Sequence, residues 1–127
     1  MPTRRGPAAN LRMRRVYEPA SPDDGLRVLV DRLWPRGLAK ERAHVARWPK
    51  ELTPSTELRR WYHEAPEQRH EQFVARYEAE LDDPAAQQAL TGLRQALREG
   101  TVTLLTAVKE FPGSHVDVLA RRLTGKE

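Results

Sequence analysis

The sequence predicts an α/β protein: a small, mostly parallel sheet covered by helices, in a single compact domain with an N-terminal edge strand. Two apolar segments, residues 28–30 and 102–108, have the composition of strands buried on both faces. Stretches with helical spacing of apolar residues lie between these segments, and another follows the second. Strands and helices in this order predict parallel pairing through right-handed crossovers.

The N-terminal segment is basic and precedes the first strand. Residues 1–10 mix Pro, Gly, Arg and Asn without periodicity and predict a flexible tail, so that residues 11–127 make up the domain. Apolar residues then alternate over 11–16, as in an edge strand that turns Arg12 and Arg14 outward.

The net charge of +4 is concentrated in this segment. Residues 1–15 carry five arginines and no acid, whereas the remaining 112 residues hold 17 Lys or Arg against 18 Asp or Glu. A basic arm can bind nucleic acid by releasing counterions. A solvated tail running into a charged edge strand, which discourages aggregation of the sheet, explains the same charge.

The stretch 27–40 passes from an apolar strand into a loop rich in cations. Pro35 has no N–H for a strand ladder, and Gly37 allows the backbone to turn. The loop therefore carries Arg32, Arg36 and Lys40 past the carboxyl end of the strand. Ligands of open α/β sheets usually bind there.

Helix-start signals divide the middle of the chain. Thr53 followed by Pro54 predicts an N-cap with proline at the first helical position. Apolar spacing predicts a helix over 67–81. The Asp-Pro pair at 83–84 opens another helix, which Gly100 ends.

The loop after the second strand leads to a final helix that Ser114 can cap, with Asp117 placed to complete a capping box. Parallel strands bring their carboxyl ends to one rim, so the two loops should form one site. Its predicted ligand-binding residues are Arg32, Trp34, Arg36, Lys40, Lys109 and Ser114. The candidate proton carriers of a catalytic site are His115 and Asp31.

These residues also have structural interpretations. Asp31 and Arg32 can pair at the end of a strand, and His115 can be an exposed residue of a first helical turn. Trp34, like the other two tryptophans, fits packing in the core or at a subunit interface as well as a wall for ligand stacking.

Several kinds of chemistry are excluded. The chain has no cysteine, so it has no disulfide, zinc–thiolate site, iron–sulfur cluster or thiol nucleophile. Its four histidines show no metal-ligand spacing, and there is no dinucleotide fingerprint or P-loop, so no metal is predicted and no cofactor is identified. Without a long apolar run or a signal-peptide pattern, we expect a cytoplasmic protein with no membrane partner.

Four segments and two single residues together carry a resemblance to a known family. The segments are residues 28–37 (Val-Leu-Val-Asp-Arg-Leu-Trp-Pro-Arg-Gly), 48–59, 73–81 and 102–105, and the single residues are Lys40 and the next histidine after the last segment, His115. This pattern resembles the YeaO-like branch of domain-of-unknown-function family 488, over nearly all of residues 12–123. The resemblance implies a compact cytoplasmic α/β protein and carries no settled activity.

Distant members of that family often show a Cys-His-Arg element after the second strand. The corresponding place here resembles Ser114-His115-Val116, which keeps the histidine and lacks the thiol and the arginine. The resemblance thus implies a binding role or an altered reaction.

The sequence therefore predicts a rim that binds a small anionic ligand, such as a nucleotide or a phosphorylated metabolite. The expected contacts are Arg32, Arg36 and the helix start at Ser114, supported by Lys40 and Lys109. An enzyme of unknown reaction and a non-catalytic binding module both remain open. The alternative is a nucleic-acid or protein-interaction module that uses the basic arm, and the oligomeric state is undetermined.

Overall fold

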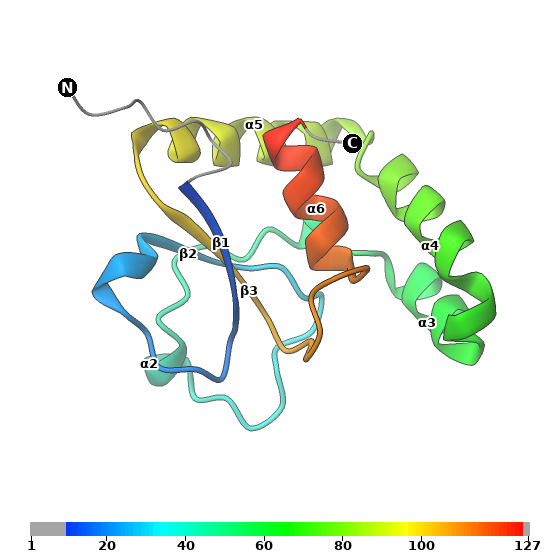
Figure 1. The fold of residues 1–127 in the computed structure, drawn as a ribbon, viewed down its shortest axis with the longest axis horizontal. Helices are drawn as coiled ribbons and strands as arrows, with labels where there is room; N and C mark the ends of the chain where they lie inside the picture. Colours follow the sequence, from blue (N-terminus) through cyan, green and yellow to red (C-terminus); the bar gives the residue numbers. More distant parts are fainter. Residues whose placement is uncertain (1–9, 126–127) are drawn as a thin grey trace.

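The computed structural model describes residues 10–125 and contains a three-stranded parallel sheet in the order β1-β3-β2 (Figure 1). Strands β1 (Leu11–Arg15) and β2 (Leu26–Leu29) both pair with β3 (Val102–Thr106). The predicted α/β fold with its N-terminal edge strand is confirmed. The tail predicted for residues 1–10 lies, except for Asn10, outside the described residues.

The position predicted for the strand at residues 28–30 is wrong. Burial on both faces predicts a strand inside the sheet, but β3 is the central strand. Of the strands only β3 pairs with β2, and one isolated bridge joins Val28 to Arg47. A loop covers the outer edge of β2 instead. The Leu29 N–H donates to the Arg47 carbonyl over 2.9 Å, and the Ala46 N–H donates to the Arg27 carbonyl over 2.9 Å. The apolar composition of the segment therefore reflects its burial and not a central position.

The helices that the structure describes are α2 (Lys40–Ala43), α3 (Thr56–Glu64), α4 (Pro66–Glu80), α5 (Pro84–Glu99) and α6 (His115–Thr124), with 3-10 turns η1 (Pro22–Asp24) and η2 (Lys50–Leu52). Helix α5 has the predicted Asp83 cap and ends at Gly100. None of the helices within residues 10–125 is long and apolar enough to cross a membrane.

The cap predicted for α3 is wrong by two residues. Ser55 caps this helix, since its Oγ accepts the Leu58 N–H over 3.1 Å. Thr53 is buried and donates its hydroxyl to the Lys50 carbonyl over 2.7 Å, which ends η2. Two hydroxyl residues flank Pro54, and the short η2 turn determines which of them begins the helix.

The cap of α6 forms at the predicted residue with a different second contact. Ser114 accepts the Asp117 N–H through its side chain over 3.4 Å. The Asp117 carboxylate reaches one residue further back than a capping box requires and accepts the Gly113 N–H over 2.9 Å.

The two faces of the sheet are covered differently. Helices α3 to α6 pack on one face, where the main apolar core includes Val28, Val30, Val102 and Leu104. Figure 1 shows α5 running across one end of the sheet, with α6 crossing in front and α3 and α4 at the side. The opposite face holds a smaller cluster, in which Val16, Leu29 and Leu105 pack beneath side chains of the segment 34–48: Trp34, Leu38, Val45 and Trp48.

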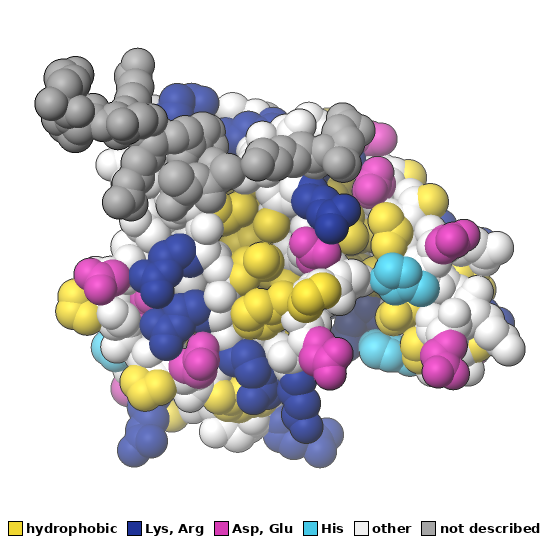
Figure 2. All heavy atoms as spheres, in the orientation of Figure 1, with side chains coloured by type: hydrophobic (Ala, Val, Ile, Leu, Met, Phe, Trp, Pro, Cys, Tyr) yellow, Lys and Arg dark blue, Asp and Glu magenta, His cyan; other side chains and the backbone are white. Residues whose placement is uncertain are grey.

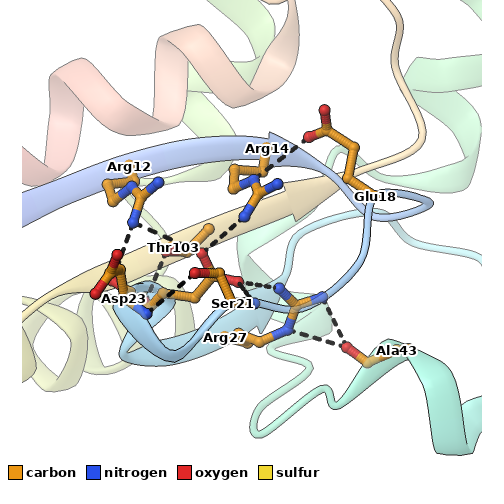
Figure 3. Close-up of polar contacts among 9 residues, drawn as sticks. Arg12, Arg14, Glu18, Ser21, Asp23, Arg27, Ala43 and Thr103 are labelled. Carbon is orange, nitrogen blue, oxygen red and sulfur yellow. Dashed lines mark hydrogen bonds and ion pairs between the residues drawn. The ribbon is translucent and has the colours of Figure 1, made fainter.

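The amino-terminal part of this second face is polar and is organised by the buried carboxylate of Asp24 (Figure 3). Arg14 and Arg27 donate to this carboxylate, the Ser21 N–H also donates to it, and an Arg12 guanidinium nitrogen lies 3.7 Å away. Arg12 and Arg14, predicted to face outward, therefore point away from the helices but connect the edge strand β1 to Asp24. Asp24, shared with Arg27, and Glu18 therefore offset part of their charge within the fold.

The chain turns into β2 at a position that only glycine fits. Gly25 has a φ of +62°, and a Cβ atom there would lie 2.1 Å from the Thr101 carbonyl oxygen. We expect Gly25→Ala to lower the free energy of unfolding by about 2 kcal/mol or more, measured by urea denaturation. Gly92→Ala is the control, because this helical position meets nothing within 4 Å, and it should gain about 0.5–1 kcal/mol. If the Gly25→Ala and Gly92→Ala variants have equal free energies of unfolding, the close approach of Gly25 to the Thr101 carbonyl is contradicted.

Candidate functional site

The carboxyl ends of β2 and β3 meet at one rim, where Asp31 joins them. The Val30 N–H donates to the Leu105 carbonyl over 3.0 Å. The Asp31 carboxylate then accepts the Thr106 hydroxyl over 2.6 Å and the Ala107 N–H over 2.8 Å. One side chain thus fixes the starts of both rim loops.

Helix α6 places His115 against this carboxylate. The His115 Nε2 atom lies 3.0 Å from Asp31 Oδ1 and 3.0 Å from the Val30 carbonyl oxygen. Burial raises the pKa of Asp31, but hydrogen bonds from His115, the Ala107 N–H and the Thr106 hydroxyl outweigh burial and hold the pKa below its ordinary value. The Asp31 carboxylate is therefore ionised near neutral pH, with hydrogen bonds to both oxygens.

Arg32 lies at the rim but is engaged by the protein itself. Its Nε donates to the Pro54 carbonyl over 2.9 Å, and Nη2 lies 3.4 Å from the carbonyl oxygens of Lys50 and Thr53. These contacts hold the loop before α3 against the rim. The geometry gives Arg32 a structural role beside the ligand-binding role predicted for it.

A cleft of about 720 Å³ opens beside the Asp31–His115 pair, between the rim loops and the hairpin of α3 and α4. Figure 2 shows histidine side chains where this hairpin faces the start of α6. Of the predicted site residues, the cleft is lined by Asp31, Arg32, Trp34, Arg36, Ser114 and His115. Lys40 starts α2 and Lys109 follows β3; both are exposed, and the cleft is not lined by either.

The hairpin contributes residues that the sequence did not predict. They are Arg59, Tyr62 and His63 from α3, with His70 and Phe73 from α4. The His70 Nε2 atom lies 2.8 Å from the Gly113 carbonyl oxygen, and Tyr62 stacks on Phe73 with ring centroids 4.3 Å apart. Arg59 and His63 are four residues apart, so the sequence alone could have shown that they lie on the same face of one helix. Nothing in the sequence showed that α3 approaches the rim.

Two arginines that line the cleft are not paired with other described residues through their side chains. Within residues 10–125, the guanidinium groups of Arg36 and Arg59 have no hydrogen-bond or ion-pair partner. Arg36 is exposed on its loop, where its backbone carbonyl accepts the Tyr17 hydroxyl over 2.9 Å, and Arg59 is half-buried on α3. The two face a cleft whose acids are Glu110, exposed, and Asp31, already engaged.

Trp34 forms part of both the cleft and the smaller core. Its Nε1 donates to the Leu38 carbonyl over 2.8 Å, and its ring meets Trp48 edge-on with centroids 5.5 Å apart. The packing role and the position beside a ligand therefore coexist in this residue. In the part of the chain that the structure describes, no group of His, Asp or Glu side chains is arranged to hold a metal ion.

Fold and cleft together define a small α/β protein with a ligand-sized opening at the carboxyl rim of a parallel sheet. The chain belongs to the DUF488 family, in the group described as the inactive DUF488-N3 subclade, which matches residues 10–126. The resemblance drawn from the sequence is thereby confirmed.

Two relatives support this membership. The uncharacterized protein Rv3073c of Mycobacterium tuberculosis is 47% identical over 116 residues, covering 91% of this chain and 95% of the relative. The uncharacterized protein YeaO of Escherichia coli is 42% identical over 113 residues, covering 87% and 94%. No solved structure matches the chain significantly.

Proposed function

We propose that the cleft binds a small anionic molecule, such as a nucleotide or a phosphorylated metabolite, through Arg36 and Arg59. The observation that carries this proposal is the pair of guanidinium groups without a protein partner among the described residues, in a cleft whose buried carboxylate is already engaged. Guanidinium groups bind phosphate and carboxylate with two parallel hydrogen bonds.

The shape and walls of the cleft suit an organic anion. Its volume of about 720 Å³ is within the range of small-molecule sites. Trp34, Tyr62 and Phe73 supply aromatic surface beside the two arginines. A ligand with a flat or apolar part and an anionic group would use both features.

Binding without turnover fits the site best. The Ser114 hydroxyl donates to the Phe111 carbonyl over 2.6 Å and caps α6, so it is not activated as a nucleophile. The chain has no thiol, and the description of its subclade as inactive supports the same conclusion. We therefore propose a binding module.

A thermal-shift screen of nucleotides and phosphorylated metabolites tests this proposal, with the native chain and Arg36→Ala measured side by side. A ligand at about one hundred times its dissociation constant stabilises the native protein by roughly 2.7 kcal/mol. For a domain of this size, the melting temperature then rises by several degrees. The Arg36→Ala variant should lose most of that rise. A screen without hits, or hits that the variant keeps, would reject the site.

A further inference from the structure

We infer that His115 presents an unprotonated Nδ1 to the cleft, so that the ligand carries a hydrogen-bond donor, a hydroxyl above all, close to its anionic group. This inference rests on the proposed function and narrows the ligand to a hydroxylated organic phosphate.

The first step is the position of the proton on His115. Its Nε2 atom lies 3.0 Å from two oxygens, the Asp31 carboxylate and the Val30 carbonyl. A backbone carbonyl only accepts hydrogen bonds, and so does an ionised carboxylate. Nε2 must therefore carry a proton, and in this Nε2–H tautomer of the imidazole the nitrogen able to accept is Nδ1.

The second step is that the surroundings fix this tautomer. Asp31 also accepts the Thr106 hydroxyl and the Ala107 N–H, so its carboxylate cannot turn away from the ring without losing both bonds. The side chains of His115 and Asp31 are 14% and 15% exposed, which leaves little room for water to replace either of them. Asp31 is thus a positioning residue for the imidazole.

The third step is what the cleft offers to a ligand. No residue in the described range 10–125 donates to His115 Nδ1, and His115 lines the cleft. His70 repeats the pattern, because its Nε2 lies 2.8 Å from the Gly113 carbonyl and its ring lines the same cleft. The cleft therefore combines cationic donors, Arg36 and Arg59, with the acceptor nitrogens of the two histidines in their Nε2–H tautomers. A ligand complementary to both bears an anionic group and a donor.

The test compares two probes that differ in their hydroxyl groups, glycerol 3-phosphate and propyl phosphate, by calorimetric titration of the full chain. The native protein should bind glycerol 3-phosphate about 3- to 10-fold more tightly, as expected for an added hydrogen bond. Equal affinities would overturn the inference.

His115→Gln is the matched variant, because its amide N–H can still donate to Asp31 while the acceptor at Nδ1 is lost. The preference for glycerol 3-phosphate over propyl phosphate, measured as the ratio of their affinities for the same variant, should fall to about onefold. A preference that survives in His115→Gln would overturn the inference. If Arg59→Ala binds neither phosphate while the native protein prefers glycerol 3-phosphate, the result supports both the inference and the anion site.

A long-range proton–nitrogen NMR spectrum of the native chain reads the tautomer without any ligand. We expect the Nε2–H form for His115, and in Asp31→Ala a mixture of both forms. An Nδ1–H form in the native chain would overturn the inference and leave the anion site standing. If neither phosphate binds, the proposed function fails instead, and the proposed choice of ligand fails with it.

Discussion

Asp24→Asn should destabilise the fold by about 3–5 kcal/mol, the usual cost of removing one partner from a buried ion pair. Asp24 is fully buried, and its carboxylate compensates Arg27, which is itself only 5% exposed and donates in addition to the Ala43 carbonyl. The neutral amide leaves that guanidinium buried without its counter-ion. In thermal unfolding we expect the melting temperature to fall on the order of 10 °C.

Asp23→Asn is the control, since the neighbouring side chain is exposed and makes none of these contacts. It should change stability by less than about 0.5 kcal/mol. If Asp24→Asn unfolds at the same temperature as this control, the cluster of Figure 3 does not hold the edge strand in place.

The same cluster should make the free energy of unfolding depend on pH in the acidic range. Burial raises the pKa of Asp24, but hydrogen bonds from Ser21, Arg14 and Arg27 outweigh burial and lower the pKa below its ordinary value. The stabilisation is therefore complete above the unfolded pKa, near 3.9, and is lost as the pH falls through the folded pKa. Below about pH 4 the native chain should lose more stability than Asp24→Asn, as measured by urea denaturation at each pH.

Arg59→Ala should weaken binding of an anionic ligand by roughly 10- to 100-fold, the value of a hydrogen bond to a charged group. Arg59 is half-buried at the cleft and has no partner among residues 10–125, so its removal should leave stability nearly unchanged. Calorimetric titration with the strongest hit of the thermal-shift screen measures the effect.

The adjacent Arg60 is a matched control on the same helix. It is exposed and does not line the cleft, so Arg60→Ala removes the same net charge without removing a contact. Affinity should change less than about twofold at physiological ionic strength, because exposed charges are strongly screened there. Equal losses in both variants would show that binding depends on overall charge and not on this cleft.

The local parts of the fold were predictable because short segments determine them. Hydrophobic spacing located α4, and the Asp-Pro and Gly signals bounded α5, since caps and apolar stripes are properties of consecutive residues. The strand ending at Val108 in the prediction stops at Thr106, where the Thr106 hydroxyl turns to Asp31. That contact joins residues 75 positions apart, and no local pattern reports it.

The site was predictable on one side only. Parallel strands must deliver their ends to one rim, so Asp31 and His115 could be expected near each other, and they lie in contact. The opposite wall depends on how the hairpin of α3 and α4 docks, which is set by packing of side chains such as Phe73 and Tyr77 in the core. Arg59 and His70 were missed for that reason.

The most direct test of the anion-binding cleft is a two-dimensional amide NMR titration of the full chain with the strongest phosphorylated hit. We predict that chemical shifts move in residues that line the cleft: those within 31–36, the α3 and α4 residues Arg59, Tyr62, His63, His70 and Phe73, and Ala107, Val108 and residues 113–115. Arg59→Ala should strongly reduce these changes at the same ligand concentration. Shifts confined to the arginine-rich residues 1–15, or spread evenly over the surface, would contradict the account.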